Sequence, residues 1–162
     1  MYRSRRLRDD LLSFYGLHFP YTAKRKSSLP YEVTLGIGGN LGDVRRRFEH
    51  LFFMFKREKQ LAVMQTGLIL KNPPFGYKEQ DDFFNSIIIV RTSMQPKAFL
   101  RYLQRIEKKF GRKRSFANAP RTLDLDILFF DNREVKTKDL TIPHASWFER
   151  ESVLIPLTGV RG

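Results

Sequence analysis

Apolar residues recur with the spacing of β-strands in four segments of this chain, over residues 31–37, 61–70, 83–92 and 123–130. Successive side chains of a strand point to opposite faces, so an alternating segment has one face suited to a hydrophobic core. Residues 87–90 are isoleucine and valine, which favour strands. The pattern therefore predicts four strands.

Two other segments have the spacing of helices. The first is predicted over residues 41–59, with Asn40 as its N-cap. Its core positions share one helix face, and they are Phe48, Leu51, Phe52 and Phe55. The second is predicted over residues 96–110, with Pro96 in its first turn and Gly111 as its stop.

In chain order the predicted elements read β-α-β-β-α-β, with two helices that cross over one sheet. We therefore expect an α+β fold, a ferredoxin-like βαββαβ sandwich in which the helices pack on an antiparallel sheet. Residues 133–162 contain short, mixed segments, which predict a small C-terminal β or helical addition.

Residues 1–30 are predicted to be a basic N-terminal extension in front of a domain that spans residues 31–162. A largely apolar stretch of the extension, residues 11–17, is predicted to form a short amphipathic helix, which Pro20 prevents from continuing. Because this stretch contains leucine and phenylalanine, we expect it to pack against the domain.

The chain has 162 residues, a formal net charge of +13 and no cysteine. A disulfide framework and a thiolate metal site are therefore excluded. No apolar run reaches the length of a membrane span, and residues 1–30 lack the pattern of a signal peptide. We expect a cytoplasmic monomer without membrane association.

The positive charge is concentrated in two places. Residues 1–30 hold seven Lys and Arg against two Asp, residues 97–121 hold nine against one Glu, and the remainder has 14 of each sign. The second basic segment leads directly to Asp124 and Asp126. A positive region beside two carboxylates indicates a polyphosphate ligand with its metal ion, and nucleic acid is the competing interpretation.

Asp124 and Asp126 fall on one face of the last predicted strand, opposite Leu123, Leu125 and Ile127. Their Cα atoms are expected about 7 Å apart, and two like charges so close are costly unless a cation lies between them. Mg²⁺ takes oxygen ligands of this kind, usually together with substrate phosphates. The pair therefore predicts a divalent metal site, and two solvated acids on an exposed strand are the alternative.

Three arginines precede this strand, and Arg112, Arg114 and Arg121 are suited to contact one phosphate chain from several directions. Phosphoryl transfer depends largely on positioning and charge neutralisation, so arginines and a metal ion can carry it without a protein nucleophile. A basic surface loop is the alternative. Gln104 and Glu107 share a face of the second helix, where they either hold a nucleotide or form ordinary helix surface.

Aromatic and amide side chains occur together in residues 72–76 and 83–85. Such a mixture suits a flat heterocycle with polar edges, although core packing explains the phenylalanines equally well. Asn85 lies in an apolar strand, and a buried amide needs a hydrogen-bond partner. His144 has no second histidine nearby for a zinc site.

The glycines at the end of the first strand are predicted to shape a strand-to-helix turn. They are Gly36, Gly38, Gly39 and Gly42. They match neither the dinucleotide-binding pattern nor the Walker pattern.

Several blocks of sequence, in this order, resemble the 6-hydroxymethyl-7,8-dihydropterin pyrophosphokinase family of folate biosynthesis. They are residues 35–43 (LGIGGNLGD), 72–76 with 82–85 (NPPFG, DFFN), 104–107 with 111–114 (QRIE, GRKR), 120–128 (PRTLDLDIL), and 140–144 (LTIPH) with Arg150. The block over residues 120–128 is highly specific to this family.

The resemblance implies transfer of diphosphate from ATP to the pterin hydroxymethyl group, with release of AMP, on a ferredoxin-like fold. It implies two Mg²⁺ ions held by Asp124 and Asp126, with phosphate contacts from arginines. Those arginines are Arg112, Arg114 and Arg121. ATP-contacting positions of the family are matched by Gln104, Glu107, Arg121, Ile127, Thr141, His144 and Arg150. Pterin-pocket positions are matched by Asn72, Pro73, Phe75, Phe83 and Asn85.

The chain departs from the family pattern at aromatic positions. Phe83 stands where a common member has tyrosine, and Ser152 stands where another ring of the pterin pocket is expected. Three rings are candidates to replace it: Phe75, Trp147 and Phe148. Asn118 aligns with a frequent tryptophan of the basic loop, which is one residue shorter here, and Phe116 is the expected substitute.

A basic nucleic-acid-binding module on the same fold is the alternative hypothesis. The charge and the aromatic content of 14% favour it. Against it, the aromatic motif of RNA-reading sheets is absent, and a basic nucleic-acid-binding surface gains nothing from Asp124 and Asp126. We therefore expect ATP and 6-hydroxymethyl-7,8-dihydropterin as partners, and no nucleic acid.

Overall fold

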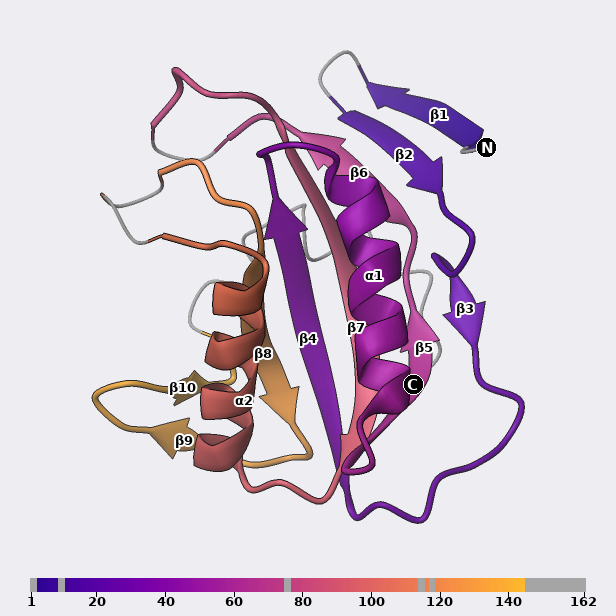
Figure 1. Ribbon diagram of the computed structural model, residues 1–162, viewed down its shortest axis with the longest axis vertical. Helices are drawn as coiled ribbons and strands as arrows, with labels where there is room; N and C mark the ends of the chain where they lie inside the picture. Colours follow the sequence, from indigo (N-terminus) through magenta and orange to yellow (C-terminus); the bar gives the residue numbers. More distant parts are fainter. Residues whose placement is uncertain (1–2, 9–10, 75–76, 114–115, 117–118, 145–162) are drawn as a thin grey trace.

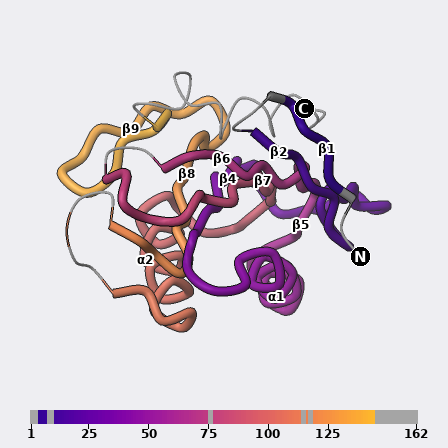
Figure 2. Tube along the Cα trace, turned by 90° about the horizontal axis from the view of Figure 1, so that it is seen from above, coloured from indigo at the N-terminus to yellow at the C-terminus, as the bar shows by residue number. Residues whose placement is uncertain are grey.

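A large antiparallel sheet with two helices on one face forms the body of the protein, which is an α+β fold (Figure 1). The computed structural model describes residues 3–8, 11–74, 77–113, 116 and 119–144. Viewed along the sheet, α1 (Val44–Arg57) and α2 (Pro96–Lys109) form one layer and the strands form the other (Figure 2). Neither of these two helices is long and apolar enough to span a membrane.

The strand β4 (Tyr31–Gly39) pairs with β7 (Phe83–Thr92) on one side and with β8 (Asp124–Phe130) on the other. The opposite edge of β7 is shared by β5 (Leu61–Thr66) and β6 (Ile69–Asn72). The core lies between the sheet and the helices. Its fully buried side chains include Val33, Leu35, Phe48, Leu51, Phe52, Phe55, Phe99 and Phe130.

The strand predicted over residues 61–70 is wrong in its extent, because the chain forms two strands there. Gly67 and Leu68 separate β5 from β6. The Gly67 N–H donates to the Ile87 carbonyl, and the buried Ser86 hydroxyl contacts the carbonyls of Gly67 and Leu68. These bonds to β7 hold the break in place. The strand over residues 83–92 is confirmed.

The predicted start of the first helix is also wrong. α1 begins at Val44, and its N-cap is Asp43, whose carboxylate accepts from the Arg46 N–H at 3.2 Å. Gly42 has a φ of +73°, which turns the chain before the helix. The side chain of Asn40 instead bonds to Gln80, Asp81 and Arg121. α2 begins at Pro96 as predicted.

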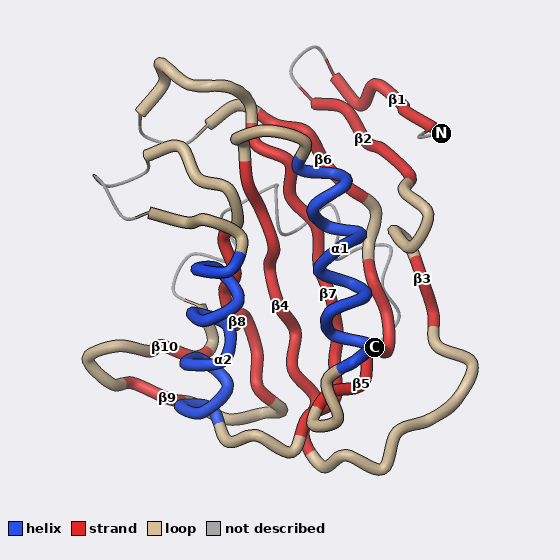
Figure 3. Tube along the Cα trace, in the orientation of Figure 1, coloured by secondary structure: helices blue, strands red, loops and turns tan. Residues whose placement is uncertain are grey.

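The helix predicted over residues 11–17 is wrong, because the segment is a strand. β1 (Arg3–Arg8) and β2 (Leu11–Tyr15) form a hairpin, and β2 pairs with β6 (Figure 3). β3 (Tyr21–Thr22) pairs with β5. One edge of the short strand β6 pairs with β7, and the other edge is available to residues 11–15. Pairing with this edge favours a strand over a helix in residues 11–15. The expected packing against the rest of the chain is confirmed.

Two short strands follow β8. They are β9 (Val135–Lys136) and β10 (Thr141–Ile142), and they pair with each other beside α2 (Figure 1). Ile142 is buried. Val135 and the loop over residues 137–140 line one cavity together with α2, so this part of the hairpin lies next to the second helix.

Candidate active site

Three connections meet at one end of the sheet: the β4–α1 turn, the β6–β7 loop and the α2–β8 loop (Figure 1). The buried side chain of Asn40 joins them. Its Nδ2 donates to Gln80 Oε1 at 2.8 Å and to the Asp81 carbonyl at 2.9 Å. Its Oδ1 accepts from the Arg121 N–H at 3.0 Å, and its own N–H donates to the Arg121 carbonyl at 3.0 Å. Asn40 therefore fixes all three connections relative to one another.

Arg47 makes a second link between α1 and the segment that precedes β8. Its Nη1 donates to the carbonyls of Leu41 and Thr122, each at 2.7 Å. Burial lowers the pKa of Arg47, although the nearby Asp43 carboxylate opposes the shift. A guanidinium can satisfy two carbonyls at once, so it fixes the main chain just ahead of the aspartate pair.

β8 presents the two aspartates as the alternation predicts. Leu123, Leu125 and Ile127 are buried, while Asp124 and Asp126 on the other face are partly exposed. The first strand residue is Asp124, so the pair lies at the end of the sheet where the three connections meet.

Two arginines contact the Asp124 carboxylate, one at each oxygen. Arg112 Nη1 lies 2.8 Å from Oδ1, and Arg121 Nη1 lies 3.1 Å from Oδ2. The two ion pairs offset part of the negative charge of Asp124, while the metal ion expected between the two aspartates stays a prediction. The third predicted arginine, Arg114, lies outside the described residues.

Glu107 supports this cluster from α2. Its Oε2 accepts from Arg112 Nη1 at 2.5 Å and from the Leu125 N–H at 2.8 Å. Burial raises the pKa of Glu107, and the bonds from Leu125 and Arg112 oppose the shift. Burial lowers the pKa of Arg112, but Asp124 and Glu107 outweigh it, and the net shift is upward. Glu107 thus holds both the arginine and the strand.

The donor set fits a hard divalent cation. Within the described residues each Asp124 oxygen accepts one arginine bond, a carboxylate oxygen has two lone pairs, and Asp126 lies two residues further along the same face. Within the described part of the chain, no three His, Cys, Asp or Glu side chains gather as a metal cluster. A Mg²⁺ ion there would need further oxygen ligands from a substrate.

Three of the predicted pterin residues, Asn72, Phe83 and Asn85, lie on β6 and β7, and Pro73 directly follows β6. Asn85 Nδ2 donates to Asn72 Oδ1 at 2.6 Å, which confirms the partner expected for the Asn85 amide. Asn72 Nδ2 in turn donates to the Pro73 carbonyl at 2.9 Å. Phe83 is buried, and the Arg121 guanidinium carbon lies 5.1 Å from its ring centre. A Cβ at Gly38 would lie 2.5 Å from Asn85 Oδ1, so glycine leaves room for the amide.

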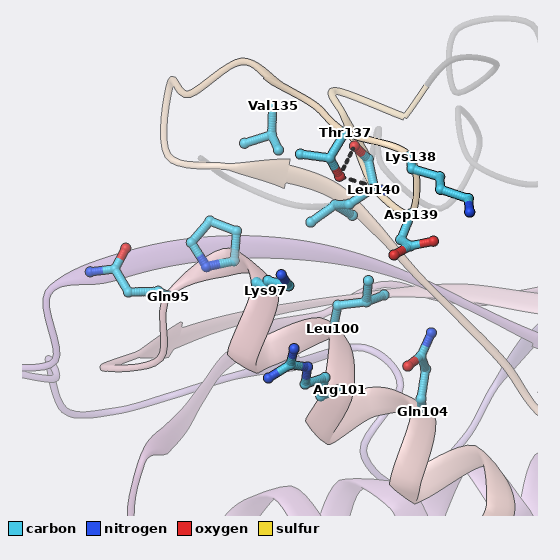
Figure 4. Close-up of a pocket in the computed structure, with 11 residues that line it drawn as sticks. Gln95, Lys97, Leu100, Arg101, Gln104, Val135, Thr137, Lys138, Asp139 and Leu140 are labelled. Atoms are coloured by element: carbon cyan, nitrogen blue, oxygen red, sulfur yellow. Dashed lines mark hydrogen bonds between the residues drawn. The ribbon is translucent and has the colours of Figure 1, made fainter.

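A cavity of about 930 Å³ lies between α2 and the β9–β10 hairpin. Leu100 and Leu140 face its interior, and Gln104 lies at the end opposite Gln95 (Figure 4). A smaller cavity of about 360 Å³ continues along α2. Its lining residues are Gln104, Glu107, Lys108 and Arg112. Gln104 lines both cavities and therefore connects them to the arginine cluster.

The other predicted ATP-contacting residues are placed around β8 and β10. Ile127 is buried in β8, Thr141 is exposed in β10, and the His144 N–H donates to the Leu128 carbonyl at 3.0 Å. Arg150 lies outside the described residues.

The aromatic substitutions are only partly described. Phe116 is exposed, and its ring centre lies 5.1 Å from that of Tyr77 on the β6–β7 loop, edge to face. Its substitution for the ring missing at position 118 stays a prediction. The other residues concerned lie outside the described part: Phe75, Asn118, Trp147, Phe148 and Ser152.

Sequence reasoning missed three residues that organise the site. Asn40 was predicted only as a helix cap, and Gln80 and Arg47 were not predicted at all. The glycines around Asn40 signal a tight turn, but its partners are up to 81 residues away in sequence. Three arginines follow one another at positions 45–47, and nothing in the sequence indicates that Arg47 is the one that binds main-chain carbonyls.

Comparison with known proteins agrees with the family resemblance of the sequence motifs. A model of the 7,8-dihydro-6-hydroxymethylpterin-pyrophosphokinase (HPPK) family matches residues 34–162. A protein of Campylobacter jejuni named 2-amino-4-hydroxy-6-hydroxymethyldihydropteridine pyrophosphokinase is 39% identical over 86% of this chain and 88% of its own length. The protein of the same name from Helicobacter pylori is 40% identical over 86% of each chain.

A longer relative shows the same match. Folic acid synthesis protein FOL1 of Dictyostelium discoideum is 39% identical over 79% of this chain, which is 19% of that protein. Because the family model covers most of the chain and the two bacterial relatives align over most of their length, the chain belongs to the 7,8-dihydro-6-hydroxymethylpterin-pyrophosphokinase family.

Proposed function

We propose that the protein transfers diphosphate from ATP to the hydroxymethyl group of 6-hydroxymethyl-7,8-dihydropterin, with release of AMP. The observation that carries the proposal is the position of Arg121. Its guanidinium contacts the Asp124 carboxylate and also covers the Phe83 ring. A phosphate-binding cluster and an aromatic pocket wall therefore meet at one side chain, as a diphosphate acceptor with a flat ring requires.

In this reaction the hydroxymethyl oxygen attacks the β-phosphorus of ATP, and the bond from that phosphorus to the α,β-bridging oxygen breaks. No protein nucleophile is needed. Arg112 and Arg121 neutralise the charge that develops on the phosphate oxygens. Asp124 and Asp126 would hold Mg²⁺, two ions in our proposal, and bound Mg²⁺ supplies further charge neutralisation and orients the phosphates.

The two substrates have distinct places in this proposal. The cavities that share Gln104 receive the nucleotide, with its phosphates directed at the arginine cluster. Asn72 and Asn85 present amide groups to the polar edge of the pterin, beside Phe83. Arg114, Arg150 and Phe75 complete these sites in the same proposal.

The strand order supports a ferredoxin-like fold for the domain over residues 31–162. β8, β4 and β7 are adjacent in that order, and β5 and β6 lie beyond β7. The helices follow β4 and β7, as they do in a split βαβ arrangement. The strands of residues 3–22 extend the sheet beyond this unit, and the β9–β10 hairpin belongs to the proposed C-terminal addition.

The direct test is an assay of AMP formation from ATP, Mg²⁺ and the hydroxymethyl pterin. The full chain should form AMP only when the pterin is present. Asp124→Asn and Asp126→Asn should each reduce the rate on the order of 100-fold or more, because each removes a charge from the metal site. Glu134→Gln is the matched control, since Glu134 is an exposed acid of the turn after β8.

Two results would contradict the proposal. One is a folded full chain that forms no AMP with this pterin. The other is an unchanged rate in both aspartate variants, which would show that the reaction does not need these carboxylates as metal ligands. Salt-sensitive binding to oligonucleotides in place of AMP formation would favour the nucleic-acid alternative.

A further inference from the structure

We propose that strand β2 positions the pterin side of the active site, which makes Phe14 a positioning residue for the reaction. The inference rests on the proposed function. β2 precedes the residues 34–162 that the family model matches, so the family match assigns it no role. Its contacts converge on the two strands that carry Asn72, Phe83 and Asn85.

β2 borders the strand that leads into the site. Leu12, Ser13 and Phe14 pair with Lys71, Leu70 and Ile69 of β6. β6 has only four residues, and three of them pair with β7 on its other side. Its last residue is Asn72, which accepts the bond from Asn85. A strand so short is held in register by neighbours on both edges.

Phe14 also contacts β7 through its side chain. Its ring centre lies 5.8 Å from that of Phe84, and the Arg45 guanidinium carbon lies 4.8 Å from the Phe14 ring and 5.6 Å from the Phe84 ring. Phe84 lies between Phe83 and Asn85 in β7, so its side chain is on the opposite face of the sheet. Phe14 therefore fixes, from the helix-covered face, the strand segment whose other face holds the proposed pterin residues.

The rest of the segment is anchored away from the site, on α1. His18 Nδ1 lies 2.6 Å from Glu49 Oε2, and the His18 ring stacks on Phe52 at 4.3 Å. Phe19 is fully buried. These contacts hold the extension but do not involve β6 or residues 83–85. The segment thus offers a stability anchor at His18 and a site contact at Phe14, which can be tested separately.

Loss of the Phe14 ring is expected to loosen β6 and the Phe84 segment without changing α2 or the nucleotide cavities. Pterin affinity should therefore fall while nucleotide affinity is kept. An aromatic pair contributes about 0.5–1.5 kcal/mol, which corresponds to a change of up to about tenfold in a dissociation constant.

The experiment compares full-length Phe14→Ala, Phe14→Tyr, His18→Ala and Leu17→Ala with the wild type. Calorimetric titration gives the Kd of a nonhydrolysable ATP analogue and the Kd of the pterin in its presence, and thermal unfolding gives Tm. Phe14→Ala should raise the pterin Kd about three- to tenfold and leave the nucleotide Kd within twofold. Phe14→Tyr keeps the ring, so its pterin Kd should stay close to that of the wild type.

The controls separate positioning from stability. His18→Ala should lower Tm with an unchanged pterin Kd, and Leu17→Ala should change neither, because Leu17 is 78% exposed. Equal pterin affinity in wild type and Phe14→Ala, or an equal loss of affinity in Phe14→Ala and His18→Ala, would overturn the inference. A wild-type chain that binds no pterin would instead contradict the proposed function.

Discussion

Arg112 Nη1 donates to Asp124 Oδ1 across 2.8 Å, and the same nitrogen lies 2.5 Å from Glu107 Oε2. A single guanidinium therefore joins α2 to the first residue of β8. Lysine carries the same charge but lacks the planar fork that reaches two acceptors and a phosphate together. The proposed role of Arg112 at the phosphates thus depends on this geometry as well as on its charge.

We therefore expect Arg112→Lys to lower kcat for AMP formation on the order of 100-fold, in line with the loss of one preorganised charge-stabilising group. Steady-state kinetics at saturating ATP and pterin measure the effect. Arg105→Lys is the control, because Arg105 is an exposed arginine of α2, the helix that precedes Arg112. A wild-type kcat in Arg112→Lys would show that charge alone suffices at this position.

Glu107 should give the protein a specific pH dependence of stability. Burial raises the pKa of its carboxyl in the folded state. Its contribution to the free energy of unfolding is then fully present below the unfolded pKa of about 4.3 and is lost as the pH rises through the raised folded pKa. Glu107→Gln cannot ionise, so the wild type should lose stability relative to this variant as the pH rises over that range.

Denaturant unfolding of the wild type and Glu107→Gln, from about pH 4 to about pH 8, measures this difference. Glu58→Gln provides a comparison at a carboxyl on the other helix, at its C-cap. A wild type that gains stability relative to Glu107→Gln with rising pH would show that the ionised carboxylate of Glu107 stabilises the fold. The bonds from Arg112 and Leu125 would then outweigh the burial of the charge.

Features that depend on neighbouring residues could be predicted from the sequence. The alternation of Leu125 with Asp124 and Asp126 placed both carboxylates on one face of β8, because side-chain direction on a strand is local. Pro96 marked the start of α2 for a similar reason, since its missing N–H costs least in a first turn.

Features that depend on distant partners could not be predicted. The stretch Leu11–Tyr15 was expected to be helical, and it forms a strand because β6 offers it an edge more than 50 residues later in the chain. Asn40 was expected to cap a helix. Its amide instead bonds to Gln80 and Arg121, which a scan for local capping patterns cannot detect.

Arg47 should contribute to both stability and activity. Arg47→Met keeps much of the side-chain length and removes two bonds, to the carbonyls of Leu41 and Thr122. The Leu41 bond is exposed, but leaving the partly buried Thr122 carbonyl without a partner costs about 1–3 kcal/mol, so the free energy of unfolding should fall toward the lower end of that range. The AMP-forming rate should also fall, because Thr122 lies two residues before Asp124.

Arg46→Met is the matched control for this variant, since Arg46 is the exposed neighbour on the same helix turn. Denaturant unfolding and the AMP assay are run on both proteins. Equal losses in the two variants would mean that the charge of α1, and not the bonds of Arg47, is responsible.

The pterin side of the site should depend on the space that the missing side chain of Gly38 leaves for the Asn85 amide. An added Cβ would lie 2.5 Å from Asn85 Oδ1, too close to be accommodated unless the amide moves away from Asn72. Because the displaced atom ends a side chain, we expect Gly38→Ala to lower the free energy of unfolding by about 1 kcal/mol, the low end of the cost of overpacking. It should raise the KM for the pterin several-fold and leave the KM for ATP nearly unchanged.

Gly36→Ala is the control, since its Cβ would meet Leu128 at an ordinary 3.4 Å. Equal pterin KM values in the two variants would show that the Asn85 amide does not need its present position.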